Sequence, residues 1–284
     1  MTRTTPPRPV DIAELFPELR DHCATTTRLH PRPGTPGVGD SSIGGPPRWP
    51  AGEPWPYCTD GDHDDDKDML TTLAPVDQPI PMILVAQLYR RDVPGFIGPD
   101  DHDLMQVLWC PLDHTEHDYQ PRVHVVWRRS ADVTEALDTI PEPPVANEAY
   151  LPRPCALHPE QVVEYQFQDL LPDDLRSRID EWDSGSPSYF FDLSLAPGWK
   201  LGGFPDWSVS GPRKVSCATC GSEMAFLLAA ASGEWANEGQ SWRPRDDPPD
   251  TDIDPAGVVL GRAEDLNLFY CPASFDHPVA AAGQ

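Results

Sequence analysis

Apolar residues recur along the chain as short runs separated by polar, proline-rich stretches. Ile80–Tyr89, Leu104–Trp109 and Val123–Trp127 are nearly continuous runs of aliphatic and aromatic residues, which predicts buried strands. The same criterion predicts further strand regions at Val162–Phe167, Ser188–Leu195, Met224–Ala230 and Val258–Tyr270. Short strands of this kind favour an α+β fold rich in antiparallel or mixed sheets.

Helical spacing is confined to short segments. Asp11 can cap a short helix that Pro17 bends, with its apolar face formed by Ile12, Leu15, Phe16 and Leu19. Pro172 is expected to start a helix that runs to about Trp182. A third short helix is predicted for Ala131–Leu137. These helices are too few to form a layer of their own, so we expect them to pack beside the sheets.

Three blocks of the sequence occur twice, in the same order, which predicts an internal duplication. The pairs are Ser42–Pro50 with Lys200–Trp207, Met82–Leu88 with Met224–Ala230, and Asp103–Pro111 with Asp265–Pro272. The chain then divides into an N-terminal segment with a short helix (1–40), repeat 1 (41–138), a Pro-rich linker with a strand and helix (139–199), and repeat 2 (200–284). We expect the two repeats to pack as one globular unit, because strands this short do not form independent cores.

Each first block contains a Gly-Gly pair followed by proline and tryptophan. Glycine accepts positive φ and close backbone approach, so Gly44–Gly45 and Gly202–Gly203 are predicted to turn the chain sharply. Trp49 and Trp207 would then anchor the core beside each turn. A phosphate-binding loop is the alternative, but both copies lack the further glycines and the Lys-Ser/Thr of that motif.

Composition and charge restrict the class of partner. The chain has 36 prolines among 284 residues, which disfavours long helices, and a formal net charge of −25. This charge disfavours binding to nucleic acid or to an anionic membrane, whereas a basic protein stays a candidate partner. The acidic run Asp60–Asp68 is predicted to be a solvated insertion that repeat 2 lacks; a hard-cation site with oxygen ligands is the alternative, but the run lacks the spacing of a calcium loop. An odd number of cysteines, seven, and the lack of a signal peptide or long apolar run favour a cytoplasmic protein.

Cysteines and histidines occupy matching places in the two repeats. Repeat 2 offers Cys217-x-x-Cys220 and then Cys271 with His277; repeat 1 offers Cys58 with His63 and then Cys110 with His114. A tetrahedral zinc site can be built from two pairs of ligands, each pair near one turn. Each repeat is therefore predicted to hold a structural zinc, with the weaker cluster in repeat 1. Buried free cysteines or a redox Cys-x-x-Cys are the alternatives. Cys155 and His158 form a reserve ligand pair.

Eight segments together resemble the YwqG-like family of uncharacterised bacterial proteins, in particular its actinobacterial branch. They are Thr25–Gly34, Ser42–Pro50, Gln87–Gly95, Val107–His114, Cys155–Tyr165, Gly198–Ser208, Cys217–Gly221 and Tyr270–Pro278. The resemblance implies a duplicated α+β fold without an established activity. The part from Lys200 to His277 is also similar to the zinc module of the programmed cell death protein 2 family, which is associated with chaperoning a ribosomal protein.

Three classes of function compete at this level. A non-enzymatic protein-interaction module, chaperone-like or immunity-type, agrees with the acidic charge and with four-ligand metal sites. A zinc hydrolase would need an open coordination position and a base, for which Glu223 and Asp276 are the neighbours. A thiol redox protein would use Cys217 and Cys220, but these motifs usually open a helix, and Gly221 follows the pair here. The sequence therefore favours the interaction module.

Overall fold

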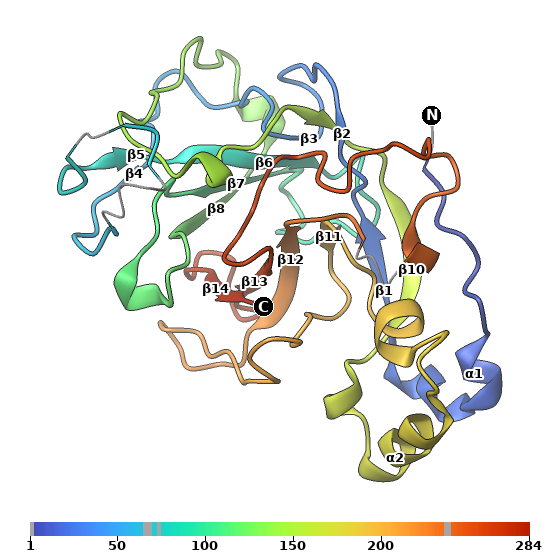
Figure 1. Cartoon of the computed structure of the whole chain (residues 1–284). Coiled ribbons are helices and arrows are strands. Elements are labelled where there is room, and N and C mark those ends of the chain that lie inside the picture. The colour runs from blue at the N-terminus through green and yellow to red at the C-terminus, as the bar shows by residue number, and fades with distance from the viewer. Residues whose placement is uncertain (1–2, 65–69, 73–74, 236–239) are drawn as a thin grey trace.

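The computed structural model describes residues 3–64, 70–72, 75–235 and 240–284. Two six-stranded sheets dominate it, and every strand pairing in them is antiparallel (Figure 1). Sheet A has the strand order β10 (Glu160–Tyr165), β1 (Cys23–Arg28), β11 (Lys200–Leu201), β12 (Ala225–Ala231), β13 (Asp265–Tyr270) and β14 (Ala280–Gly283). Sheet B has the order β2 (Arg32–Pro33), β9 (Cys155–Ala156), β3 (Ser42–Ile43), β6 (Ile83–Tyr89), β7 (Leu104–Trp109) and β8 (Val123–Arg128).

The remaining elements are short. A two-stranded ribbon joins β4 (Tyr57–Cys58) to β5 (Ile80–Pro81), and the α-helices are α1 (Ile12–Leu15) and α2 (Asp173–Trp182). Single 3₁₀ turns span Pro17–His22, Thr115–His117, Ser130–Asp132, Glu148–Tyr150, Gln168–Leu170 and Gln240–Trp242. The predicted α+β class with antiparallel sheets and few helices is confirmed. In the described residues, no helix has the length and apolar character needed to cross a membrane.

The two sheets share one hydrophobic core. Val85, Leu88 and Val107 of sheet B belong to the same buried cluster as Leu228 and Leu266 of sheet A. All residues of β6 and β7 are buried, because these central strands are covered on both faces. Strands from residues 1–40 and 139–199 enter both sheets, so these segments complete the sheets rather than only flanking the repeats.

Three strands of each sheet pair in the same order. β3 pairs with β6 and β6 with β7, as β11 pairs with β12 and β12 with β13. The register shifts once in each long pair, between Leu84 and Ala86 and between Phe226 and Leu228. This likeness agrees with the repeats expected from the sequence, but the duplication itself stays a prediction.

The Gly-Gly turns require glycine because of their backbone conformation and because a side chain would have no room. Gly44, Gly202 and Gly203 all have positive φ. A Cβ on Gly203 would lie 2.2 Å from Oε1 of Glu164, so only glycine fits there without displacing that carboxylate. Trp49 and Trp207 are both buried in clusters beside the turns, as core anchors should be.

Several expected elements differ from the structure. The predicted strand Ser188–Leu195 is wrong: Tyr189–Ser194 forms a π-helical turn instead. Asp192 stabilises this turn, because its carboxylate accepts from the Ser188 N–H at 2.9 Å and its own N–H donates to the Ser188 carbonyl at 3.0 Å. The turn buries Tyr189 and Leu193 in one cluster with Leu175 and Ile179 of α2.

Other predicted elements are shorter or packed differently in the structure. The predicted helix Ala131–Leu137 is only the 3₁₀ turn Ser130–Asp132, since the Leu137 N–H donates to the Trp49 carbonyl at 2.7 Å. Asp11 makes no side-chain cap hydrogen bond, and Leu15 is 48% exposed rather than part of the buried face. The region Val258–Tyr270 is a strand only from Asp265.

The Pro-rich stretch Thr139–Pro154 is not a free linker. Val145 and Tyr150 are buried, and the Asn147 N–H donates to the Pro111 carbonyl at 2.7 Å. This packing holds the stretch against the end of β7. Of the predicted acidic insertion, Asp65–Asp68 lies outside the described residues.

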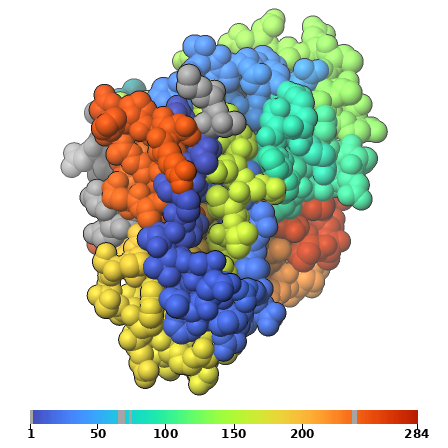
Figure 2. Space-filling model, turned by 90° about the vertical axis from the view of Figure 1, so that its right-hand side faces the viewer, coloured from blue at the N-terminus to red at the C-terminus, as the bar shows by residue number. Residues whose placement is uncertain are grey.

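The N-terminal segment also packs along its length. The backbone N–H of Arg245 donates to the Thr4 carbonyl at 3.0 Å, and Arg3 donates to the Asp246 carbonyl at 2.9 Å. Figure 2 shows this blue segment beside the orange segment that contains residues 240–257. The contact joins two segments that lie far apart in the sequence.

Candidate metal centres

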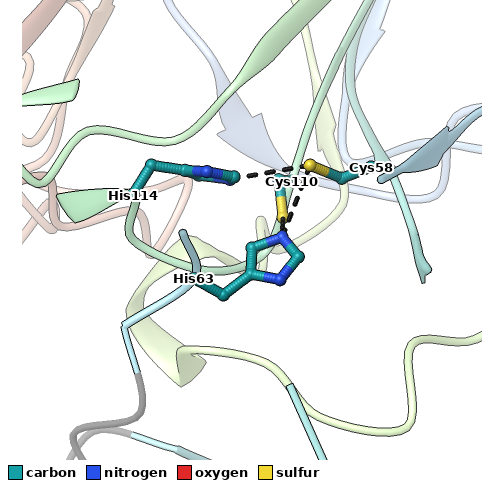
Figure 3. A group of neighbouring side chains, drawn as sticks. All are labelled: Cys58, His63, Cys110 and His114. Carbon is teal, nitrogen blue, oxygen red and sulfur yellow. Dashed lines mark hydrogen bonds between the residues drawn. The ribbon is translucent and has the colours of Figure 1, made fainter. Parts of the chain in front are cut away.

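The structure brings together all four residues predicted to form the cluster of repeat 1. Cys58 comes from β4, His63 from the loop that follows, and Cys110 and His114 from the end of β7 and the turn after it (Figure 3). Each of the four is buried. The backbone at His63 forms a bridge with His114, which aligns the two loops that carry the histidines.

Distances within this first cluster are those expected around one ion. Nε2 of His63 lies 3.4 Å from each of the two sulfurs, and Nε2 of His114 lies 3.6 Å from the Cys58 sulfur. Zn–S bonds of 2.3 Å and Zn–N bonds near 2.0 Å at tetrahedral angles put S and N about 3.5 Å apart. These three distances match edges of a coordination tetrahedron, and all four ligand atoms lie within 4.8 Å of one another.

Both histidines are held by their second ring nitrogen. Nδ1–H of His63 donates to the Val76 carbonyl at 2.7 Å, and Nδ1 of His114 lies 2.8 Å from Oδ1 of Asp62. A carbonyl or carboxylate at Nδ1 fixes the tautomer that leaves the Nε2 lone pair free for a metal. Asp62, missed as a functional residue, is therefore part of the site. Its place next to His63 in the acidic run was the available signal.

The cluster favours a thiolate at Cys58, while Cys110 keeps its proton. The pKa of the Cys58 thiol is lowered to about 2, mainly because Cys110 donates a hydrogen bond to it, with further contributions from His114 and His63. The same shared proton raises the pKa of Cys110. Burial works to raise the pKa of Asp62, but its hydrogen bond with His114 outweighs this and lowers it to about 2. A cation at the centre would release the remaining proton, since metal ligation requires thiolates.

The second cluster contains the four residues predicted for repeat 2. Cys217 and Cys220 lie on the turn before β12, Cys271 directly follows β13, and His277 lies on the loop after it. Nδ1 of His277 is 3.5 Å from the Cys217 sulfur and 3.3 Å from the Cys271 sulfur. The sulfurs of Cys220 and Cys271 are 3.5 Å apart. Here the histidine faces the sulfurs through Nδ1, in contrast to the first cluster.

A short backbone turn places the two neighbouring cysteines. The Gly221 N–H donates to the Cys217 carbonyl, and the Cys217 N–H donates to the Ser222 carbonyl, both at 2.8 Å. Gly221 has φ of +73°, which closes the turn with little strain. Hydrogen bonds from Ser222, and then from Cys271, lower the pKa of the exposed Cys220 thiol to about 6. Desolvation raises the pKa of Cys271.

The reserve ligand pair, Cys155 and His158, does not join either cluster. Cys155 is buried with its sulfur 3.3 Å from the Pro255 carbonyl, and burial raises the pKa of its thiol. Desolvation lowers the pKa of His158, whose backbone N–H donates to the Leu29 carbonyl. The two candidate bases are also engaged elsewhere, since Glu223 pairs with Lys214 at 3.2 Å and Asp276 binds Ser274. In the described part of the chain, all seven cysteines are free thiols.

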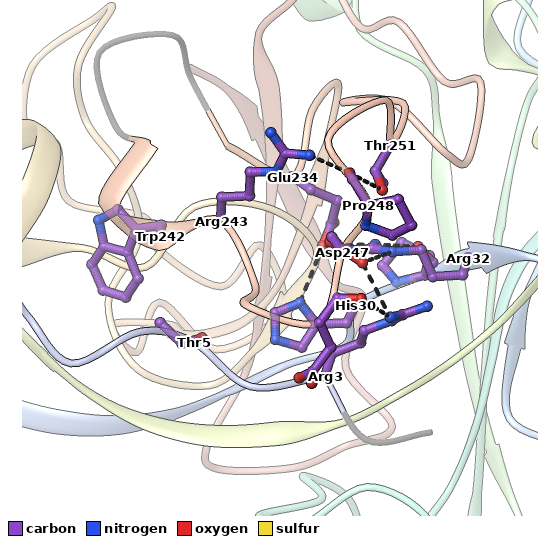
Figure 4. A network of polar contacts seen from close by, with 12 residues as sticks. Arg3, Thr5, His30, Arg32, Glu234, Trp242, Arg243, Asp247, Pro248 and Thr251 are labelled. Atoms are coloured by element: carbon purple, nitrogen blue, oxygen red, sulfur yellow. Dashed lines mark hydrogen bonds and ion pairs between the residues drawn. The ribbon is translucent and has the colours of Figure 1, made fainter.

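A separate network of buried charges ties the N-terminal segment to sheet A (Figure 4). The His30 ring is fully buried, with Nε2 3.3 Å from Glu160 and Nδ1 3.6 Å from Glu234. Asp247 pairs with Arg32, and also with Arg3 at 3.4 Å. Oppositely charged groups surround one another in this network, which is typical of structural ion pairs. We therefore assign it to the packing of the segment.

Comparisons with known proteins assign no family: no protein-family model matches the chain, and no curated protein matches it.

Proposed function

We propose that each cluster holds one structural zinc ion, and that the protein is a non-enzymatic binding module whose partner is a protein of positive charge. The observation that carries this proposal is the closed set of four soft ligands in both clusters. Tetrahedral sites of two cysteines with two histidines, or three cysteines with one histidine, are typical of structural zinc. Such a site offers no coordination position for a substrate, which disfavours the hydrolase.

The partner class rests on charge. With 46 acidic and 21 basic side chains, the chain is strongly negative, so a basic surface would associate with it more readily than an acidic one. The resemblance to the YwqG-like family supplies no activity that would compete with this reading, and membership in that family stays a prediction.

Metal analysis of the purified full-length protein tests the zinc proposal. We expect two zinc ions per chain, one of which is lost in Cys110→Ser and the other in Cys271→Ser. Cys23→Ser and Cys155→Ser are matched controls, because one thiol is exposed and the other buried, and both lie outside the clusters. A wild type free of zinc, or equal zinc loss in Cys23→Ser, would refute the proposal.

Cys220 favours one alternative, a thiol redox site. Its thiol is exposed and its pKa is lowered to about 6, first by hydrogen bonds from Ser222. If this alternative is correct, mass spectrometry after mild oxidation will find a Cys217–Cys220 disulfide that thiols reverse, in protein purified with full metal content. Under the zinc proposal, the two thiols stay protected from oxidation until a chelator removes the ion.

A further inference from the structure

A cavity of about 640 Å³ opens on the face of sheet A that points away from the shared core. Leu228, Leu266 and Leu268 point into that core. Their neighbours Ala229 and Asn267 therefore lie on the opposite face of the sheet, and both line the cavity.

The cavity exists because sheet A has a small residue where sheet B has a large one. Ala229 pairs in register with Lys200 and Asn267, as Gln87 pairs with Ser42 and Gln106 in sheet B. The Gln87 side chain fills its place: its amide donates to the Val38 carbonyl at 3.0 Å and accepts from Gln106 at 2.9 Å. The methyl side chain of Ala229 is too short to fill the equivalent space, which leaves the floor of the cavity empty.

The hollow leaves one buried acceptor without a donor. In sheet B, Oε1 of Gln106 accepts from Nε of the Arg128 guanidinium at 2.8 Å. In sheet A, Nδ2 of Asn267 donates to the Asp206 carbonyl at 2.8 Å, but no group among the described residues donates to its buried Oδ1. Leaving a buried acceptor unpaired is costly, so a donor brought by a ligand would be stabilised here.

Charge in the cavity favours a cationic donor. Asp206, Glu264 and Asp265 line it. The Lys200 ammonium in its wall is already neutralised by Glu164 at 2.8 Å, which leaves the exposed Arg262 as the remaining basic lining residue. Desolvation, together with the nearby charge of Asp206, raises the pKa of the Asp265 carboxyl to about 8, so a bound cation would stabilise the ionised form and release the proton.

The rim of the cavity is apolar and exposed. Phe191, Val209 and Ile253 line it with 41%, 61% and 37% of their surface accessible to solvent. Large apolar side chains gathered at one opening are typical of binding surfaces. They would cover the apolar stem of a ligand whose polar end reaches the floor.

We propose that this cavity binds an organic cation, an alkylguanidinium or alkylammonium group that donates to Asn267 Oδ1 and pairs with Asp265 while its stem lies against the apolar rim. The cation can belong to a small amine or to an arginine or lysine side chain of a peptide. This inference concerns a site separate from the metal centres and does not depend on zinc.

Isothermal titration calorimetry on the full-length, metal-loaded protein tests the proposal. The probes are butylguanidinium and a capped Gly-Arg-Gly peptide, with butanol and the matching citrulline peptide as neutral controls. Binding of either cationic probe, at least about tenfold tighter than its neutral control, supports the site and identifies its source. The proposal is overturned if neither cation binds, or if the neutral probes bind equally well.

Two variants locate the binding. Ala229→Gln copies the residue of sheet B and should fill the hollow, and Asp265→Asn removes the carboxyl group that would ionise against the cation. Each should weaken cation binding at least about tenfold. Glu223→Gln removes a carboxylate outside the cavity and should bind like wild type. Near-UV circular dichroism confirms that each variant is folded. Unchanged affinity in both cavity variants, or equal weakening in Glu223→Gln, would show that the cation binds elsewhere.

Discussion

Single contacts outside the ligand sets decide how well the clusters can hold a metal. His114 reaches the first cluster in one orientation because Asp62 holds its Nδ1, and His63 is held by the Val76 carbonyl. In the second cluster, the Ser222 carbonyl accepts from the Cys217 N–H and closes the turn. The residues that orient a ligand therefore matter nearly as much as the ligand itself.

Asp62→Ala should weaken zinc binding at the first cluster by about 10–100-fold, because the His114 ring loses the partner that fixes its tautomer. The measurement is competition with a chromophoric chelator, in a Cys271→Ser background that isolates this cluster. Asp64→Ala removes a neighbouring carboxylate that does not touch either histidine, and should keep the parent affinity. Equal affinities of the Asp62→Ala and Asp64→Ala proteins would contradict the role of Asp62.

Gly203→Ala should destabilise the fold strongly, by about 3 kcal/mol or more, because it adds a clash to an unfavourable φ. Its Cβ would meet Glu164 Oε1 at 2.2 Å and the Thr26 side chain at 2.7 Å. Gly211→Ala is the matched control, since Gly211 has φ of +73° and open space around it. The control should lose only about 1–2 kcal/mol, measured by urea unfolding. Similar losses in both variants would mean that contact with Glu164 is unimportant.

At the scale of elements, strand ends position the chemistry. β7 and β13 both end directly before a cysteine and a proline, so the residue that follows each strand delivers a sulfur to the cluster. β10 has a different role, because its first residue, Glu160, accepts from Thr5 and contacts His30. The N-terminal segment is thus tied to sheet A through one carboxylate.

Glu160 should make this attachment dependent on pH. Burial works to raise its pKa, but hydrogen bonds with His30 and Thr5 lower it from 4.5 to about 2. Because the folded-state pKa is the lower one, its stabilisation is complete above pH 4.5 and is lost as the pH falls toward 2. We expect Glu160→Gln to be less stable than wild type by about 1–2 kcal/mol at pH 6, because solvent screens part of the interaction, with the difference shrinking below pH 4.5.

Urea unfolding of both proteins at several pH values measures this difference. Glu181→Gln, on the exposed side of α2, is the control and should match wild type throughout. A Glu160→Gln difference that is constant with pH would show that the carboxylate does not stabilise the fold through its charge.

At the scale of the whole molecule, the metal clusters lie in different parts of the core. Cys58 and Cys110 belong to one satellite hydrophobic cluster with Trp49, and Cys217 and Cys271 to another with Trp207. These two satellite clusters share no buried residue with each other or with the core between the sheets. Each ion would therefore stabilise its own end of the molecule.

The effects of losing the two metal sites should be additive. We expect Cys110→Ser and Cys271→Ser each to lower the free energy of unfolding, and the double variant to lose the sum within about 0.5 kcal/mol. Chemical unfolding with zinc present measures all three, and a chelator should bring wild type to the stability of the double variant. A double variant no less stable than either single one would place the four cysteines in one coupled unit.

The sequence alone determined the features that depend on local pattern. The continuous apolar run Leu104–Trp109 predicted β7 with its observed bounds, and helical spacing after Pro172 predicted α2 to within one residue. Recurring Cys and His positions specified eight residues that the fold gathers into two clusters, because the strands and turns carrying them recur in the same order. The positive φ that glycine accepts likewise predicted the Gly-Gly turns beside buried tryptophans.

Only the tertiary structure decided features that depend on partners distant in the chain. Residues 188–195 became a π-helical turn because Tyr189 and Leu193 could bury against α2, a choice that their apolar character leaves open. The Pro-rich stretch became part of sheet B's packing through Asn147 and Pro111. Likewise, the cavity over Ala229 arises from strand register, which pairs a small residue with Asn267. Pairing between strands that are distant in the chain sets their register and burial, and the local spacing of residues does not encode this pairing.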